Sequence, residues 1–519
     1  MESPEQTRAP LGLSRREFMV LLGKGSAAAT LAPLLPLAAQ AEAQPTKSAG
    51  ELIYASATAL AKAIREKQVS AEEVVNAYLR RIAAVNPKLN AVVQLTAEAA
   101  RAQAREADAA LARGELKGPL HGVPFTVKDT IETAGVICTA GTKGRAIFVP
   151  TQDATAVMRL RTAGAILLGK TNVSELGLLS ECDNLVYGRT SNPYDVSRIP
   201  GGSSGGEAAI LAAAASPLGL GSQDIGLSAH CCGITGVKPT AKRVPMTGHF
   251  PLPTFGVTSH QQARGGTMWQ IGPMARFVED LTLILPLVAG EDGLDPNTAT
   301  MPLGDPRTVE LKRLRVAFYT DNEIMSSTPD TVAAVRAAAK ALADVGLVVE
   351  EERPERLKQS YELFLRLTFS EPTVRWVEQM LEKAGTIEPH PWTQWFMKTA
   401  HPNKRERGDL RTLAGSVASY HSSLFAFLEK YDVILCPVSP SPAPAREATP
   451  SDAQTLVWSY LAAYAMTELP TVVVRASASP EGLPIGVQVV AREWQEHIAL
   501  AVAQHLQTVL GGWQPPQLP

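Results

Sequence analysis

The 519-residue sequence has no marked excess of charge of either sign. Its 49 lysines and arginines stand against 51 aspartates and glutamates, which gives a formal net charge of −2. A balanced chain of this kind has no basic field to attract nucleic acid, so we expect no nucleic-acid partner. After residue 43 it also contains no apolar run of about 20 residues, the length that spans a bilayer as a helix. The composition, 45% hydrophobic and 19% charged, is that of an ordinary globular enzyme.

Cysteine is scarce, and the positions of the cysteines argue against both a metal site and a set of disulfides. The odd number and scattered positions match no metal-binding pattern and no disulfide framework. We expect each thiol to be a small buried apolar group. The five are Cys138, Cys182, Cys231, Cys232 and Cys436.

Residues 1–43 differ from the rest of the chain. Residues 14–19 read SRREFM and resemble the twin-arginine export consensus, and an apolar stretch rich in glycine and alanine follows at 18–39. Ala41-Glu42-Ala43 then offers an A-x-A cleavage site. Pro33 and Pro36 argue against an uncleaved anchor in a regular membrane-spanning helix. We therefore expect a twin-arginine-type signal peptide, membrane contact only during export, and a mature protein that is periplasmic or secreted.

Residues 44–519 show the alternating pattern of an α/β protein. Ser70 and Glu73 form the capping box of a helix, and an alanine-rich helix is predicted over 96–113. Short apolar runs indicate buried strands at 122–127, 165–169, 216–222, 432–436, 471–475 and 484–491. The aromatic-rich segment 352–430 has two interpretations, core packing or a lid over an acyl or aryl pocket. The connector 245–256, rich in proline and glycine, is expected to be a surface loop.

Residues 201–206 read GGSSGG and lie between a lysine block, GVPFTVKD at 122–129, and a second serine region at 218–240. Glycines on both sides of a serine pair allow backbone conformations that a Cβ would forbid. Serine becomes a nucleophile only when another group takes its proton. A lysine can take it, provided that burial or a nearby cation lowers the lysine pKa. One lysine and two serine regions therefore indicate nucleophilic catalysis.

Several blocks in order resemble the amidase signature family, whose catalytic set is Ser–cis-Ser–Lys. They are residues 118–135, 164–177, 186–209, 232–240, 271–281, 431–444 and 483–493, and together they extend over about residues 52–508. The resemblance implies one catalytic domain over 44–519, with a large mixed β-sheet flanked on both faces by helices.

The resemblance also implies the roles of individual residues. Lys128 would be the neutral general base, and Ser203, preceded by a cis peptide bond, would pass a proton between Lys128 and the nucleophile. Gly202 and Ser204 would support this serine. No metal or organic cofactor would be needed. The substrate would be a small amide, and a homodimer is left open.

The nucleophile loop departs from the family pattern, which is roughly G-[ST]-D-x-G-G-S-x-R-x-P. Aligning DIGLS at 224–228 with the family makes Ser228 the nucleophile and Asp224 a supporting residue. The backbone N–H groups of Ile225, Gly226, Leu227 and Ser228 would then form the oxyanion hole. Gln223 looks inserted, Leu227 replaces a glycine, and the arginine–proline segment is missing. Ser222 is an alternative nucleophile.

Two nearby histidines, His121 and His230, are expected to be structural, because no G-x-S-x-G elbow accompanies them. The sequence thus predicts hydrolysis of a carboxylic amide through an acyl-enzyme. Two alternatives stay open. One is the A-type component of a tRNA-dependent amidotransferase, and the other is a catalytically impaired amidase-fold protein that only binds ligand.

The export signal can be tested with a fusion of residues 1–50 to a reporter protein. The fusion should reach the periplasm only through the translocon for folded proteins, because residues 14–19 carry the twin-arginine pattern. Replacing Arg15 and Arg16 by lysine should stop export, as measured by reporter activity in the periplasmic fraction. Unchanged export of the double mutant would rule the signal out.

Overall fold

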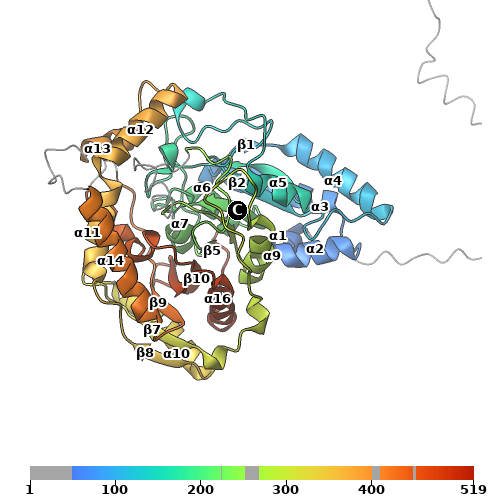
Figure 1. Cartoon of the computed structure of the whole chain (residues 1–519). Helices are drawn as coiled ribbons and strands as arrows, with labels where there is room; N and C mark the ends of the chain where they lie inside the picture. Colours follow the sequence, from blue (N-terminus) through green and yellow to red (C-terminus); the bar gives the residue numbers. More distant parts are fainter. Residues whose placement is uncertain (1–48, 224, 252–267, 400–409, 448–451, 519) are drawn as a thin grey trace, which may run out of the picture. The chain divides into compact units, whose positions relative to one another are not determined.

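An eleven-stranded mixed sheet runs through the part of the chain that the computed structural model describes, residues 49–223, 225–251, 268–399, 410–447 and 452–518 (Figure 1). The strand order is β1-β3-β2-β4-β6-β5-β10-β11-β9-β7-β8. The strands are β1 (Val92–Leu95), β2 (Pro124–Lys128), β3 (Ile166–Thr171), β4 (Leu218–Ser222), β5 (Thr235–Lys238), β6 (Ile271–Ala275), β7 (Arg315–Phe318), β8 (Val348–Glu351), β9 (Val433–Pro437), β10 (Thr471–Ala478) and β11 (Pro484–Ala491).

The pairing of the strands makes the sheet mixed. β2 runs parallel to β3 and β4, and β7 runs parallel to β8 and β9, whereas the other neighbours are antiparallel. Every residue of β2, β3, β4, β9 and β11 is buried. Strands covered on both faces read as continuous apolar runs, which is why these strands stand out in the sequence.

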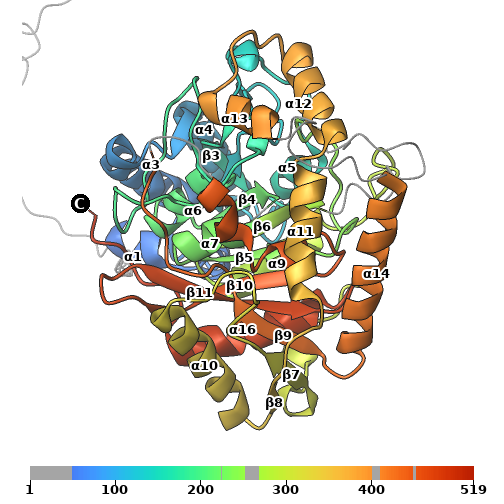
Figure 2. The same cartoon turned by 90° about the vertical axis from the view of Figure 1, so that its left-hand side faces the viewer.

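Helices cover both faces of the sheet. α10 and α16 pack on one side of β10 and β11, while α7 packs on the other side (Figure 2). α6 lies next to α7 and packs on β2 and β4. The helices are α1 (Ala49–Tyr54), α2 (Ala57–Arg65), α3 (Ala71–Leu89), α4 (Ala97–Ala112), α5 (Thr155–Thr162), α6 (Gly205–Ala212), α7 (Ile225–Cys231), α9 (Val278–Val288), α10 (Pro329–Asp344), α11 (Leu357–Thr368), α12 (Glu371–Ala384), α13 (Pro391–Thr399), α14 (Leu410–Leu428), α15 (Ala462–Ala465) and α16 (Glu496–Leu510). The predicted fold class, an α/β protein with a large mixed sheet, is confirmed.

Several local predictions agree with the structure. The Ser70–Glu73 capping box begins α3, with both reciprocal hydrogen bonds present. The alanine-rich helix predicted over 96–113 is α4. All five cysteines are buried, as expected of small apolar groups.

A separate finding concerns length and hydropathy: within the described ranges, no helix is long and apolar enough to span a membrane.

Residues Thr46–Pro519 form one compact unit. The predicted signal segment, 1–43, lies outside the described residues, and so does Asp224. The connector 245–256 was expected at the surface, but its described part, 245–251, is mostly buried. This part contains His249, which is buried and lies next to Ser222 at the end of β4.

Candidate active site

Lys128 and Ser203 meet at the edge of the sheet where β2 and β4 end. Lys128 is the last residue of β2, and its Nζ lies 2.6 Å from Ser203 Oγ and 3.0 Å from the carbonyl oxygen of Ser222, the last residue of β4. Because β2 and β4 are parallel neighbours, their carboxyl ends reach the same edge, where ligand sites of such sheets usually form. Both side chains are buried. The predicted lysine and the first predicted serine are therefore in direct contact.

The loop that carries Ser203 is packed too tightly for side chains at its glycines. The Gly202–Ser203 peptide bond is cis, as the family resemblance implied. A Cβ on Gly202 would lie 2.3 Å from the carbonyl oxygen of Leu179, and one on Gly201, where φ is +75°, would lie 2.7 Å from Ser228 Cα. These two positions accept only glycine without rearrangement of the loop.

Ser204 attaches the same loop to β4. Its Oγ donates to the carbonyl oxygen of Ser222 at 2.9 Å and accepts from the Ser222 N–H at 3.2 Å. The Ser222 carbonyl oxygen thus receives hydrogen bonds from both Ser204 and Lys128. This shared acceptor links the serine loop to the lysine, and a supporting role of Ser204 in catalysis stays a prediction.

A buried glutamate holds α6 against the strands. Glu207 on α6 accepts from Thr171 Oγ1 at 2.9 Å and is hydrogen-bonded to Thr126 on β2. Burial raises the pKa of Glu207 to about 8, against the lowering effect of these hydrogen bonds. The carboxyl group is therefore mostly protonated at neutral pH and holds the helix without a buried charge. Glu207 therefore joins α6, which begins two residues after Ser203, to β2, which ends at Lys128.

The structure does not place Ser228 in this contact. Ser228 lies within α7, its side chain is fully buried, and its Oγ has no hydrogen-bond partner among the residues that the structure describes. Ser203 Oγ donates instead to Gln223 Oε1 at 3.1 Å. Gln223, which looked like an insertion in the sequence, has φ +64° and occupies the turn after β4. The predicted Ser203–Ser228 proton relay is not formed in this structure, and Ser228 as nucleophile stays a prediction.

The predicted oxyanion hole needs one correction. The N–H of Ile225 donates to the carbonyl oxygen of Gln223 at 2.8 Å, so this group already has an acceptor. Gly226, Leu227 and Ser228 follow it in the first turn of α7, and a Cβ on Gly226 would lie 2.9 Å from Leu461 Cδ2 in the core. α7 begins at Ile225 itself, directly after the turn that holds Gln223. The other three donors stay predictions.

His249 was not identified from the sequence. Its Nδ1 lies 2.9 Å from the carbonyl oxygen of Pro251, and its Nε2 lies 2.9 Å from Ser222 Oγ. A carbonyl can only accept, so Nδ1 carries the proton and Nε2 accepts from the Ser222 hydroxyl. Burial is the main cause that lowers the pKa of His249 to about 3. The alternative nucleophile Ser222 is thus bound to a very weak base.

The two histidines expected to be structural have structural contacts. His230 Nδ1 accepts from the N–H of Gly486 at 3.0 Å, and its Nε2 lies 3.0 Å from the carbonyl oxygen of Ser441. His121 likewise accepts from the N–H of Lys117 at 3.0 Å and contacts the carbonyl oxygen of Ala107 at 3.0 Å. Since both ring nitrogens of each histidine are engaged with the backbone, neither ring is available as a base.

An apolar cavity lies next to Gln223, the hydrogen-bond partner of Ser203. Both Gln223 and Trp269 line it, and Gly177 stands next to them, where a Cβ would lie 3.6 Å from Ser203 Oγ and 3.7 Å from Trp269 Cη2. Helices α11–α13, within the segment predicted as core or lid, supply much of the remaining wall. The lining residues are Leu178, Gln223, Met268, Trp269, Phe364, Thr368, Thr373, Phe396, Trp458 and Ala465. Trp376 and Trp392 of the same segment are buried in the core, and the role of a lid stays a prediction.

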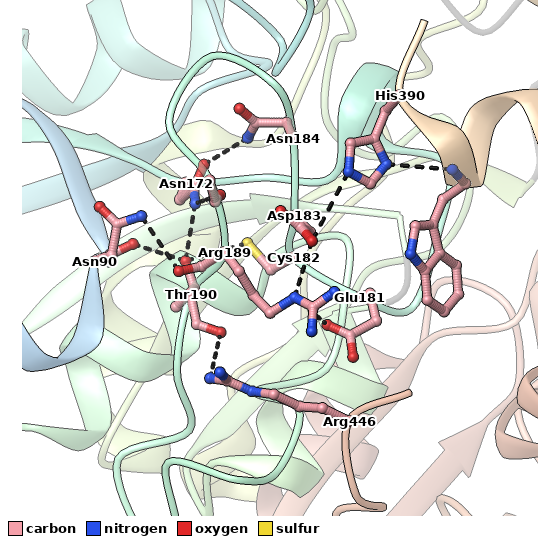
Figure 3. Close-up of polar contacts among 12 residues, drawn as sticks. Asn90, Asn172, Glu181, Cys182, Asp183, Asn184, Arg189, Thr190, His390 and Arg446 are labelled. Carbon is pink, nitrogen blue, oxygen red and sulfur yellow. Dashed lines mark hydrogen bonds and ion pairs between the residues drawn. The ribbon is translucent and has the colours of Figure 1, made fainter. Parts of the chain in front are cut away.

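A polar network holds residues 172–190, the loop that contains the cavity-lining Leu178 (Figure 3). Asn172 donates to Thr190 at 3.0 Å and accepts from Asn184 at 2.7 Å. Asp183 accepts from Arg189 at 2.9 Å and faces His390 from the variable segment at 3.8 Å. These contacts at the two ends of residues 172–190 fix the position of Gly177 and Leu178 between them.

Glu181 in the same loop is buried, and neither of its carboxylate oxygens has a hydrogen-bond partner in the described part of the chain. Burial raises its pKa to about 7, and the positive charge of Arg189, 3.8 Å away, opposes this shift. No group of three or more histidine, cysteine, aspartate or glutamate side chains is arranged for a metal ion within the described ranges.

Comparison with known proteins agrees with the geometry. A family model described as Amidase matches residues 73–500. The chain belongs to the amidase family, and within it to the amidase-signature enzymes that its motifs resemble. It is 34% identical over 480 residues to the A-type component of the glutamyl-tRNA(Gln) amidotransferase of Moorella thermoacetica, covering 87% of this chain and 96% of that protein. It is 35% identical over 503 residues to fatty-acid amide hydrolase 2-B of Danio rerio, covering 90% and 91%.

Solved structures give the same result. The structure of a 6-aminohexanoate cyclic dimer hydrolase matches with a TM-score of 0.77 and 29% identity, covering 90% of this chain and 99% of that one. The peptide amidase of Stenotrophomonas maltophilia matches with a TM-score of 0.72 and 25% identity, covering 90% and 99%. The agreement extends over nearly the whole described chain.

Replacing Gly202 by alanine tests the packing of the serine loop. The new Cβ would lie 2.3 Å from the Leu179 carbonyl oxygen, so the loop must shift. We expect destabilisation by about 1–3 kcal/mol, measured by denaturant unfolding. Gly415→Ala in α14 is the matched control, because nothing lies within 4 Å of the added Cβ. Equal stability of the two variants would contradict this description of the loop.

Proposed function

We propose that this protein hydrolyses the C–N bond of a carboxylic amide, with Lys128 as the general base. One observation carries the proposal: the 2.6 Å hydrogen bond between Lys128 Nζ and Ser203 Oγ, buried beside an apolar cavity. A neutral lysine can take a serine proton, and its ammonium form can then protonate the leaving amine. The acyl-enzyme would be hydrolysed by water. No step calls for a metal or an organic cofactor.

The sequence alignment assigns the nucleophile to Ser228, with Ser203 passing the proton between Ser228 and Lys128. In that scheme Lys128 takes the Ser203 proton while Ser203 takes the Ser228 proton, and Ser228 attacks the carbonyl carbon. Ser228 would first have to leave its buried position in α7. The chemistry of Lys128 is the same whichever serine attacks.

The cavity supports a substrate whose acyl group is apolar or aromatic. Trp269, Phe364, Phe396 and Trp458 present large apolar surfaces, while Gln223 is the amide group nearest to Ser203. Aromatic walls of this kind bind apolar groups by burial of their surface and by edge-to-face contacts. The relatives include proteins named as hydrolases of a fatty-acid amide and of 6-aminohexanoate cyclic dimer, which supports an amide substrate here.

Two other functions remain as proposals that experiment can separate. The likeness to the A-type components of amidotransferases favours a role in supplying ammonia within a larger complex. We also propose export through the twin-arginine signal, however, and export would remove the protein from aminoacyl-tRNA. The buried position of Ser228 favours a protein that binds an amide without cleaving it. Release of an amine from an acyl amide by the isolated protein would exclude the binding-only function.

Lys128→Met should lower kcat/KM by about 10²–10⁴-fold, the usual contribution of a general base. Methionine preserves most of the side-chain volume in this buried place, so the fold should persist, as circular dichroism can verify. In the wild type, kcat/KM should rise with pH because only the neutral amine accepts a proton. A Lys128→Met variant that keeps a tenth of the activity would reject the role of base.

The cavity can be narrowed at Thr368, which lines it and whose Oγ1 has no hydrogen-bond partner among the described residues. Thr368→Phe should reduce kcat/KM for amides of long or aromatic acyl groups at least tenfold, with little effect on acetamide. Thr368→Val is the matched control, since it has nearly the same shape and loses no hydrogen bond. Equal losses for large and small acyl groups would show that the cavity does not hold the acyl group.

A further inference from the structure

We propose that Trp458 is a specificity-determining residue, whose indole N–H donates a hydrogen bond to a neutral oxygen on the acyl group of the substrate. The preferred substrate is then an amide of an apolar acid that carries a second carbonyl group along its chain. This inference rests on the proposed hydrolase function and names the class of acyl group that the cavity accepts. Three features of the cavity support it: its lack of charge, an unpaired donor in its wall and the position of Gln223.

The wall of the cavity is uncharged. All ten lining residues are apolar or carry only a neutral polar group. A carboxylate or an ammonium group among them would lose its hydration without gaining a partner of opposite charge, which is strongly unfavourable. The cavity therefore accepts a neutral acyl group and rejects one that ends in a carboxylate or an ammonium group.

Trp458 brings an unpaired hydrogen-bond donor to this wall. It ends the 3₁₀ segment Asp452–Trp458, lines the cavity and is only 5% exposed. Its Nε1–H has no hydrogen-bond partner among the residues that the structure describes. Buried indole N–H groups usually have a partner, because an unpaired buried donor is costly. A ligand atom in the cavity supplies the partner that this donor lacks.

The indole ring is held by its neighbours. The Phe364 ring packs against it with the two centroids 6.0 Å apart and an interplanar angle of 65°, and both residues line the cavity. Because Trp458 is almost fully buried, the ring has little room to turn its N–H elsewhere. An indole N–H can donate but cannot accept. The matching group on the substrate is therefore an acceptor, and on a neutral chain a carbonyl oxygen fits this requirement.

Gln223 marks the end of the cavity that lies next to the proposed base. Its Oε1 accepts from Ser203 Oγ at 3.1 Å, and Ser203 Oγ lies 2.6 Å from Lys128 Nζ. Gln223 and Trp458 line the same cavity. An acyl chain whose scissile carbonyl lies at the Gln223 end therefore extends along a wall that contains the indole donor. The role of Trp458 is the same whichever serine attacks.

Thr368 carries the other unpaired polar atom considered for this role, since it also lines the cavity and its Oγ1 has no partner among the described residues. A threonine hydroxyl in a helix can rotate towards a carbonyl oxygen of the preceding turn, so it can do without a ligand. The indole N–H of Trp458 has no such local acceptor. For this reason we assign the recognition of the second carbonyl to Trp458.

A series of octanoyl 4-nitroanilides tests the role of Trp458. In each member a carbonyl group replaces one chain methylene, at C4, C5, C6 or C7, and release of nitroaniline gives kcat/KM. One position should be hydrolysed about tenfold or more faster than the plain octanoyl compound, because its carbonyl pairs with the indole N–H. Trp458→Phe should reduce this preference to within about twofold. Trp392→Phe is the matched control and should keep it, since Trp392 is equally buried but is not among the lining residues.

Uncleavable analogues give a readout that does not require turnover. In these four diketones a methylene replaces the scissile N–H, and the second carbonyl occupies each chain position in turn. In protein labelled with ¹⁵N-tryptophan, the indole resonance that is missing from Trp458→Phe identifies Trp458 among the seven tryptophans. This resonance should move downfield when one of the diketones binds, and it should not do so with the monoketone that lacks the second carbonyl.

The outcomes separate this inference from the hydrolase function. Hydrolysis without preference for any carbonyl position, or a preference that survives in Trp458→Phe, overturns the role of Trp458 and leaves the hydrolase function standing. A downfield shift without hydrolysis of any amide supports the donor and contradicts the hydrolase function. Absence of both overturns both. Faster hydrolysis of an acyl chain of the same length that ends in a carboxylate overturns the neutral class of substrate.

Discussion

The hydrogen bond between Lys128 and Ser203 is the interaction on which the site depends. A lysine buried at the end of a central strand is costly unless its amine finds acceptors, and here they are Ser203 Oγ and the Ser222 carbonyl oxygen. Both acceptors come from segments fixed by other contacts: the serine loop by its glycines and the Ser222 carbonyl by β4. The site is thus preorganised by backbone packing, and little depends on mobile side chains.

The surrounding elements can be understood from this constraint. Glu207 holds α6 to β2 and β3 as a largely neutral carboxyl group, and Ser204 binds the serine loop to β4. The network around Asn172 and Asp183 fixes the loop that contains Gly177. Helices from the variable segment supply part of the wall of the apolar cavity that Gln223 also lines. Segments with the family motifs thus carry Lys128 and Ser203, while the segment without such motifs contributes to the cavity.

Much of the fold could be predicted from the sequence, because buried strands such as β3 and β11 are continuous apolar runs and the Ser70–Glu73 capping box marks the start of a helix. The Lys128–Ser203 contact could also be expected from the ordered motifs. The surroundings of Ser228 could not, since they depend on α7 beginning at Ile225 and burying the serine. A sequence alignment gives the order of residues along the chain. It does not give the direction in which a side chain points when the turn that carries it differs from the family pattern.

The same limit explains why Gln223 and His249 were missed. Gln223 reaches Ser203 through a positive φ at the end of β4, which its residue type does not signal. His249 lies in a connector whose prolines and glycines are typical of exposed loops, yet its described part is mostly buried. Both depend on tertiary contacts between segments far apart in the chain.

A crystal structure of the protein inactivated with a fluorophosphonate would test the central claim most directly. The account predicts continuous electron density from phosphorus to the Oγ of a serine in this site, with Lys128 Nζ still within hydrogen-bond distance of Ser203 Oγ. Density on a serine remote from Lys128, or a Lys128 side chain turned away from Ser203, would contradict it.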